Sequence, residues 1–324
     1  MNGIWDVIKI IIPGAIAYTM PILMGALGGL YSERSGVTNL CIEGLMLFGC
    51  FASAATIVKL QAMGMNYTLT IICGICVAML ASMALSYLHA LASIKLKADQ
   101  TISGTAINML STALSLFLAQ TITGSGNITI VRGIIRKNIP ILSKIPVLGP
   151  LFFSQTYWTT WLCLIVWGVS YFLLYKTNFG LRLRACGEHP SAVASAGVNV
   201  HKMRYIGVLL SGVLSGLGGA VILVTYAGEY NSGAGINGLG FLAIAALIFG
   251  QWKPVKIMWA SLFFGLMKAV AAAYSGIPFL AATGIPSYVY KMIPYLATLI
   301  VLVFTSRNSQ APRASGVPYD KGQR

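Results

Sequence analysis

The sequence predicts an all-α integral membrane protein, a polytopic bundle of about eight to ten transmembrane helices. Its composition is 57% hydrophobic and only 9% charged, with a mean hydropathy of +0.79, whereas a soluble domain carries about a quarter charged residues. Apolar runs also recur with the length of roughly 20 residues that a helix needs to cross a bilayer. We expect spans at 8–30, 38–58, 69–93, 101–122, 157–175, 205–226, 237–250, 256–273 and 288–304.

The two ends of the chain differ in character. The first apolar run follows MNGIWDVIK, which has an acid at Asp6, no basic start and no small-residue cleavage site. We therefore expect this run to stay in the protein as a span and not to act as a removable signal. Residues 305–324 are polar, with four basic residues and two prolines, and we expect a disordered cytoplasmic tail there. Residues 1–304 then form a single transmembrane domain.

The placement of charge sets the orientation of the spans. The net charge is +15, from 22 basic against 7 acidic residues. The segment 176–204 carries five basic residues and one acid, so the positive-inside tendency places it in the cytoplasm. We attribute the basic surplus to topology and lipid headgroup contact. Nucleic-acid binding is excluded, since no basic face alternates with exposed aromatic residues.

The segment 123–156 does not fit this rule. It carries four basic residues and no acid, yet the odd number of spans around it places it outside. Two explanations stay open at this point: the positive-inside tendency is violated here, or a half-span lies hidden within 139–153.

The cytoplasmic segment 176–204 has the features of a docking element. His189 or Gly187 could cap a short helix that has Pro190 at its first position. Residues 191–196 are small, which lets another surface approach closely. A short cytoplasmic helix between two spans suits a soluble partner. The alternative is a connector whose basic residues only set the topology.

Two polar insertions, 31–44 and 227–238, are too short to be ordinary exposed loops. Non-helical backbone at membrane depth is tolerated only where it is buried in protein or lines a cavity, and such segments in two halves of a chain indicate a translocation path. Fragments 35–51 and 234–250 are loosely alike, which suggests an internal repeat with broken helices. The candidates for the path are Asn39, Glu43, Asn108, Glu229 and Asn237.

Several polar residues near the spans have structural explanations. Asn108 could form an interhelical hydrogen bond instead of lining the path. Asp99 stands where it can cap the next span and form an ion pair, which we favour over substrate contact. Glu33 and Arg34 are expected to pair with each other and fix the first insertion.

A metal, cofactor or catalytic site is not expected in this chain. Cys73 and Cys76 have redox or metal spacing, but they lie in an apolar run without a nearby histidine, so packing explains them. The three histidines stand apart, and only His189 has a carboxylate, Glu188, beside it. An intramembrane enzyme would need such groups to cluster.

Four motifs, in order, resemble the signatures of one transporter family. The run GALGGLYSERSGVTNLCIEGLMLFGCF at 25–51 resembles the N-terminal signature of permease subunits of bacterial ABC importers for nucleosides, within the branched-chain amino acid, ribose and simple-sugar permease group. Residues 98–110, 179–220 and 240–254 resemble three further signatures. The likeness is strongest to the nucleoside type, because Ser-Glu-Arg and Ile-Glu-Gly replace the Asp-Leu-Ser element of sugar permeases.

The resemblance implies what the segment 176–204 does and which partners the chain needs. In these permeases the loop forms a coupling helix that sits in a groove of a cytosolic ABC ATPase, which binds ATP and Mg²⁺. This chain itself has no GxxxxGK[ST] motif. Further partners implied are a second permease subunit, as a heterodimer, and an extracytoplasmic substrate-binding lipoprotein. The residues implied in coupling are Gly187, Glu188, Pro190, Ala192, Ala194 and Gly197.

The implied function is the channel-forming subunit of an importer in the cytoplasmic (inner) membrane, which moves nucleosides or a related simple sugar. Tyr226 and Tyr230 could stack on a base, although tyrosines near the interface are more often membrane anchors. The alternative is an ion-coupled secondary transporter in which Glu43, Asp99 and Glu229 carry protons. That carrier would work alone and would be collapsed by an uncoupler.

Overall fold

The computed structural model describes residues 4–140, 142–146, 149–274, 286–305 and 310–320. Seven helices in this part are long and apolar enough to cross a membrane, so the prediction of an all-α membrane protein is confirmed. The helices are α1 (Ile4–Arg34), α2 (Ile42–Ala62), α3 (Tyr67–Ala90), α4 (Gln100–Thr123), α5 (Trp158–Lys176), α6 (Asn178–Glu188), α7 (Pro190–Ser195), α8 (Val200–Ile222), α9 (Leu239–Phe249), α10 (Pro254–Ala273) and α12 (Ser287–Thr305).

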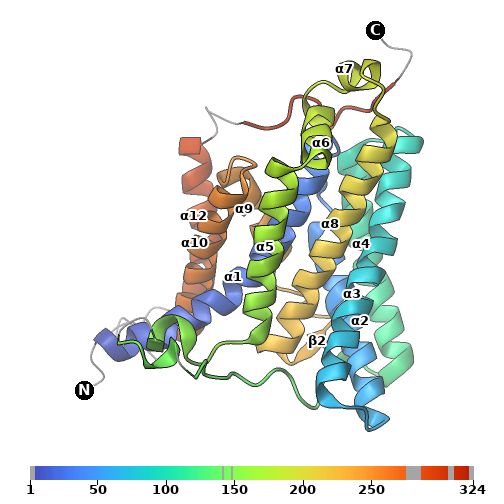
Figure 1. Ribbon diagram of the computed structural model, residues 1–324. Coiled ribbons are helices and arrows are strands. Elements are labelled where there is room, and N and C mark those ends of the chain that lie inside the picture. The colour runs from blue at the N-terminus through green and yellow to red at the C-terminus, as the bar shows by residue number, and fades with distance from the viewer. Residues whose placement is uncertain (1–3, 141, 147–148, 275–285, 306–309, 321–324) are drawn as a thin grey trace.

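The long helices lie side by side and give the molecule two ends (Figure 1). One end holds α6, α7 and residues 310–320 of the C-terminal tail. The opposite end holds the N-terminus and two short antiparallel strands, β1 (Asn127–Thr129) and β2 (Glu229–Asn231). We refer to the α7 end as the cytoplasmic end, following the charge of its loop.

The segment between α4 and α5 lies at the end opposite α7 (Figure 1). The described part of 139–153 contains only two short helical turns, Leu142–Lys144 and Gly149–Phe153. Each is far too short to serve as a half-span, so the described residues do not support that explanation. Pairing of β1 with β2 fixes this segment against the chain that follows α8.

Three helices form the centre of the bundle. Within their most apolar windows, 67% of residues are buried in α1, 56% in α2 and 78% in the helix that contains α8, against 28–39% in the helices that contain α3, α4, α5 and α10. The central helices pack closely because α8 presents glycine to its neighbours. A methyl group at Gly212 would overlap Ser86 of α3, and one at Gly219 would overlap the Met46 carbonyl of α2. Small residues of this kind let membrane helices approach each other directly.

Both polar insertions interrupt helical structure, as predicted. α1 ends at Arg34, and the chain runs irregularly to the start of α2 at Ile42. His89 of α3 holds this first insertion through Thr38, whose carbonyl oxygen lies 3.1 Å from Nε2. The second insertion runs from the end of a π-helical turn, Leu223–Ala227, through β2 to the start of α9.

The predicted span at 237–250 is wrong as a full crossing. Its helix, α9, has 11 residues and is therefore about 16 Å long, roughly half the thickness of the hydrocarbon core. The prediction failed because the whole run is apolar, while the positive φ angles of Asn237 (+55°) and Gly238 (+70°) delay the start of the helix. α9 is thus a half-helix whose N-terminus lies inside the protein.

The expectation of a disordered tail is wrong for residues 310–320. These residues lie along the cytoplasmic end of the bundle (Figure 1). The Ala314 N–H donates to the Gly187 carbonyl at 2.8 Å, and the Val317 carbonyl accepts from Nη1 of Arg204 at 2.9 Å. Asp320 forms an ion pair of 2.6 Å with Lys97. A polar sequence remains ordered here because buried groups of the bundle offer it specific partners.

Candidate translocation pocket and coupling loop

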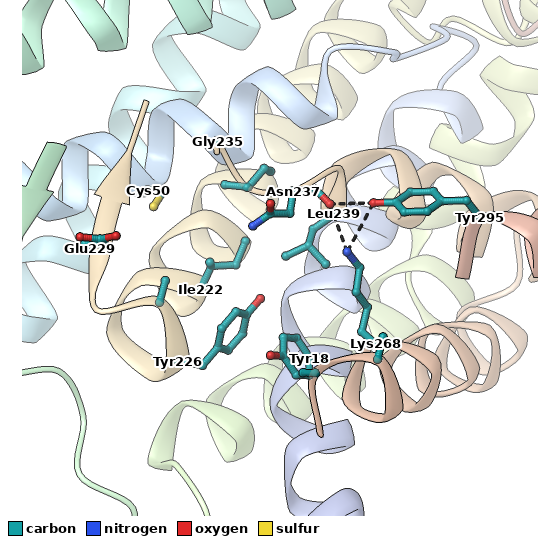
Figure 2. Close-up of a pocket in the computed structure, with 14 residues that line it drawn as sticks. Tyr18, Cys50, Ile222, Tyr226, Glu229, Gly235, Asn237, Leu239, Lys268 and Tyr295 are labelled. Atoms are coloured by element: carbon teal, nitrogen blue, oxygen red, sulfur yellow. Dashed lines mark hydrogen bonds between the residues drawn. The ribbon is translucent and has the colours of Figure 1, made fainter. Parts of the chain in front are cut away.

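A pocket of about 450 Å³ lies where the half-helix α9 begins (Figure 2). Its wall is built from α1, the turn after α8, β2, the start of α9, α10 and α12. The second polar insertion therefore lines a cavity, as expected for irregular backbone within a membrane protein. The residues that line it are Tyr18, Cys50, Ile222, Tyr226, Ala227, Glu229, Gly235, Ile236, Asn237, Leu239, Lys268, Ala271, Ala272 and Tyr295.

One side of the pocket is polar. Nζ of Lys268 lies 3.2 Å from the Asn237 carbonyl oxygen and 3.4 Å from the Tyr295 hydroxyl, which itself donates to that carbonyl at 2.9 Å (Figure 2). The three groups form a triangle that presents an ammonium group at the cavity wall. Charged residues within membrane segments are expensive and mark transport paths.

The other side of the pocket is aromatic. The rings of Tyr18 and Tyr226 have centroids 4.5 Å apart and are tilted by 51° (Figure 2). The Tyr226 hydroxyl is buried and has no hydrogen-bond partner among the described residues. A buried hydroxyl without a partner is costly, so a ligand that bonded to it would gain from this arrangement.

Of the predicted path residues, Glu229 and Asn237 line this pocket. Glu229 lies on β2, opposite Thr129 of β1, whose hydroxyl is 3.5 Å from its carboxylate. Tyr230, named with Tyr226 as a possible base-stacking residue, is placed elsewhere. It is 1% exposed and donates from its hydroxyl to Ser115 at 2.8 Å.

Glu43 supports the pocket from behind. Its carboxylate accepts hydrogen bonds from the backbone N–H groups of Gly238 at 3.1 Å, Gly240 at 2.6 Å and Phe241 at 3.2 Å. These amides form the start of α9, where the helix dipole favours negative charge. A carboxylate on α2 therefore holds the half-helix that forms one wall.

Asn39 and Asn108 hold the first insertion. Asn39 is fully buried, donates to the Ser211 hydroxyl at 2.7 Å and accepts from the Cys41 N–H at 3.0 Å. Asn108 accepts from the Gly44 N–H at 2.7 Å and donates to the Leu40 carbonyl at 2.9 Å. The alternative for Asn108, a hydrogen bond between helices, is what the structure shows. Neither side chain is among those that line the pocket.

Lys268 was missed from sequence although its signal was present. It stands inside the predicted span 256–273, where an unpaired base is itself unusual. We expected only carboxylates, and not bases, to mark the path within the spans. Tyr18 and Tyr295 carried no such signal, because a tyrosine in an apolar run is ordinary.

The predicted coupling loop, residues 187–197, lies at the cytoplasmic end of the bundle (Figure 1). Its short helix α7 has Pro190 at the first position and His189 before it, as predicted. Val193 is buried and anchors this helix, while Ala192 is exposed. Gly197 is exposed, has a φ of +81° and has nothing within 4 Å of the place where a methyl group would stand. The loop therefore presents small residues on an open surface.

The pairing predicted between Glu33 and Arg34 is wrong. Arg34 instead pairs with Glu188 of the coupling loop, at 3.3 Å. The Glu33 carboxylate accepts from the indole N–H of Trp252 at 2.5 Å. Consecutive residues of a helix point in different directions, so each reaches a different part of the chain.

Asp99 caps α4 by accepting from the Ile102 N–H at 2.9 Å, as predicted. The ion pair expected for Asp99 is not what the structure shows, since the neighbouring base, Lys97, pairs with Asp320.

Among the described residues, no three His, Cys, Asp or Glu side chains come together as a metal ion would require.

The chain is similar to known transport proteins over nearly its full length. The family described as the permease component of the branched-chain amino acid transport system matches residues 11–303. The guanosine ABC transporter permease protein NupQ of Bacillus subtilis is 42% identical over 98% of this chain and 99% of its own length. The nucleoside ABC transporter permease protein NupC of Lactococcus lactis is 40% identical, with the same coverage. The putative glucose ABC transporter permease protein TsgC13 of Haloferax volcanii is 31% identical over 90% of each chain.

These matches bear out the resemblance that the motifs indicated. They account for the seven apolar helices and identify the chain as a transport subunit and not an enzyme. The chain belongs to the family of permease components of the branched-chain amino acid transport system, and it is a multi-pass membrane subunit of an ABC transporter.

Proposed function

We propose that this chain forms the channel of an ABC importer that moves nucleosides across the cytoplasmic membrane. A separate ATPase subunit, docked on the coupling loop, binds ATP and Mg²⁺ and drives the cycle. A second permease subunit completes the channel, and a substrate-binding lipoprotein delivers the nucleoside from outside. Gly187, Glu188, Pro190, Ala192, Ala194 and Gly197 serve coupling in this proposal.

The main support for a nucleoside substrate is that the pocket has one aromatic side and one polar side. A nucleoside has a flat aromatic base and a hydroxyl-bearing sugar. Tyr18 and Tyr226 offer aromatic surface, while Lys268 offers a hydrogen-bond donor and the Glu229 carboxylate an acceptor. The volume of about 450 Å³ lies in the range of roughly 300–1,000 Å³ that small-molecule sites occupy.

The relatives support the same substrate. Those named for guanosine and for nucleosides are 42% and 40% identical to this chain, against 31% for the one named for glucose. A channel needs only a weak site, because the substrate must leave it. The few polar groups of the pocket agree with such transient contact.

The energy source of the proposal depends on the coupling loop. Ala192 and Gly197 are exposed, and the loop is anchored to the bundle through Val193. A groove of a soluble ATPase can approach so small a surface closely. The same loop contacts α1 through Glu188 and Arg34, so a force on it reaches the membrane helices.

The test is uptake by the complete transporter. The permease is reconstituted in proteoliposomes with its partner permease and ATPase, and radiolabelled guanosine is supplied with the binding lipoprotein. We expect accumulation that needs ATP, resists an uncoupler and is competed by other nucleosides but not by glucose. Competition by glucose and not by nucleosides would show that the substrate is a simple sugar instead of a nucleoside. Accumulation without the ATPase, abolished by an uncoupler, would replace the mechanism with an ion-coupled carrier.

A further inference from the structure

The half-helix α9 is held at its cytoplasmic end by an unusual turn. Gln251 and Trp252, just after Phe249, have φ angles of +50° and +52°. Residues other than glycine rarely adopt this conformation, and they persist in it only where the surroundings fix them. The Trp252 side chain is 5% exposed, so the turn is buried against the bundle.

The last two residues of α1 hold this turn from two sides. The Trp252 indole N–H donates to the Glu33 carboxylate at 2.5 Å, and Glu33 is only 7% exposed. The Trp252 carbonyl accepts from Arg34, at 3.3 Å from Nε and 3.1 Å from Nη2. Hydrogen bonds to charged groups are about twice as strong as neutral ones. The backbone and the side chain of one residue are thus both fixed to the end of α1.

The coupling loop contacts the same point. Nη1 of Arg34 lies 3.3 Å from a carboxylate oxygen of Glu188. Gly187, the residue before it, is buried, and a methyl group there would come within 2.5 Å of the Arg34 carbonyl oxygen. The planar guanidinium of Arg34 therefore bonds to the loop with one nitrogen and to the turn after α9 with the other two.

The opposite end of α9 reaches the pocket. Leu239, its first residue, and Asn237 line the cavity, and Glu43 fixes the first amides of the helix. α9 is a single helix of 11 residues without a break. Packed elements of this kind move as units between discrete arrangements and do not bend gradually.

We propose that Glu33, Arg34 and Trp252 are positioning residues that transmit movement of the coupling loop, through α9, to the wall of the pocket. The proposal rests on the proposed function, since it assigns how the ATPase acts on that pocket. None of the three residues lines the pocket. Their contribution appears in the link between ATP hydrolysis and transport and leaves the affinity of the pocket unchanged.

The test compares variants of the complete transporter in proteoliposomes. Trp252→Phe keeps the ring and loses the N–H donor, and Arg34→Lys keeps the charge and loses the fork. Glu33→Gln keeps an oxygen that can accept from the indole. Trp167→Phe is the matched control, because the Trp167 indole donates to the carbonyl of Pro254, the first residue of α10, at 3.0 Å and not to Glu33 or Arg34. The measurements are ATPase stimulation by the substrate-loaded lipoprotein, substrate moved per ATP, and the substrate concentration for half-maximal uptake.

We expect Trp252→Phe and Arg34→Lys each to reduce stimulation roughly tenfold, the effect of losing one hydrogen bond to a charged group, with half-maximal concentration unchanged. Glu33→Gln should lie between the wild type and Trp252→Phe, because it keeps an acceptor and loses the charge. Trp167→Phe should stay near the wild type. The double variant Arg34→Lys/Trp252→Phe should be no more impaired than the more impaired of the two single variants, because both changes break the same link. Arg34→Lys keeps the test decisive if Trp252→Phe assembles poorly.

Two results would overturn the link. One is wild-type stimulation in both Trp252→Phe and Arg34→Lys, and the other is an equal loss in Trp167→Phe. The measurement on the wild-type transporter distinguishes a failure of the proposed link from a failure of the proposed function. If guanosine is not taken up but another solute stimulates the ATPase, the substrate assignment fails while the variants still test the link with that solute.

Discussion

The carboxylate of Glu43 accepts a hydrogen bond of 2.6 Å from the backbone N–H of Gly240, which joins the start of α2 to the start of α9. Glu43 belongs to the first polar insertion, and Gly240 lies two residues after the second, whose last residue, Gly238, also donates to Glu43. Both insertions therefore meet behind the pocket. Gly240 is suited to this contact, because a methyl group there would come within 2.5 Å of the Glu43 Cα. Several consequences of this geometry and of the pocket can be measured.

Replacing Glu43 with Ala should destabilise α9 more than it disturbs the remaining fold. The change leaves three amides of the helix start without their acceptor, which costs about 1–3 kcal/mol. Thermal unfolding of the purified complex should shift downwards, and uptake should fall. Glu43→Gln, which keeps one oxygen acceptor, should be intermediate. Equal stability of all three proteins would show that the cap has no energetic role.

Replacing Lys268 with Met should weaken uptake at low substrate concentration. Lys268 is the charged donor of the triangle that it forms with Asn237 and Tyr295. Methionine removes this donor and keeps the length of the side chain. Losing one such contact costs about 1–3 kcal/mol, or roughly tenfold in half-maximal concentration. Lys256→Met on the same helix is the control, since Lys256 is exposed and does not line the pocket. The prediction fails if both variants behave alike.

Tyr226 separates ring and hydroxyl contributions. Tyr226→Phe keeps the ring against Tyr18 and removes a buried hydroxyl that has no partner among the described residues. Stability should therefore rise or stay equal, while half-maximal concentration rises if substrate bonds to the hydroxyl. Tyr226→Leu removes the stacking surface as well and should impair uptake further. Inhibition curves with adenosine and guanosine for each variant are the measurement.

Gly197→Trp should prevent productive docking of the ATPase. The residue is exposed and needs a φ of +81°, so a bulky side chain both strains the backbone and stands on the docking surface. Gly64→Trp is the matched control: Gly64 is also exposed, has a φ of +69° and has nothing within 4 Å, but it lies in the turn after α2, at the other end of the bundle. We expect co-purification of the ATPase to be lost for Gly197→Trp alone. Equal retention by both variants would place the docking surface elsewhere.

The tail should be protected from exchange and from protease. The Ala314 N–H is bonded to Gly187, and the Arg313 N–H lies 3.5 Å from the Glu188 carboxylate. Deuterium uptake at residues 313–317 should therefore be slower than in the free peptide of the same sequence. Trypsin should cleave after Arg313 more slowly in the folded protein than in that peptide. Equal rates of exchange and cleavage in the folded protein and in the peptide would show that the tail is disordered after all.

The sequence allowed the spans to be located because hydrophobicity is a local property. It also placed the two insertions, since Gly and Asn inside an apolar run disturb a helix wherever the run lies. What it did not contain was the identity of distant partners. Glu43 faces amides nearly two hundred positions away, and Arg204 and Gly187 offer the tail its acceptors and donors. Such pairings depend on how α8 and α9 pack in the folded protein, and the residues around each partner in the sequence do not indicate them.

Lys268 and the Glu33–Arg34 pair show two different errors. Lys268 was not predicted because only acidic residues were expected to mark the path, although its place in an apolar run is visible in the sequence. The pair failed because neighbours in sequence were treated as neighbours in space. α1 continues as helix to Arg34, so the two side chains diverge, one to an indole and the other to the coupling loop.

The ordered tail has a practical consequence for anyone who purifies this protein. Residues 310–320 lie beside Gly187 and Glu188, so an affinity tag or fluorescent protein fused just beyond them would crowd the surface that the motor subunit approaches. A fusion at the opposite terminus projects from the other end of the bundle (Figure 1). Labelling strategies for this subunit should start there.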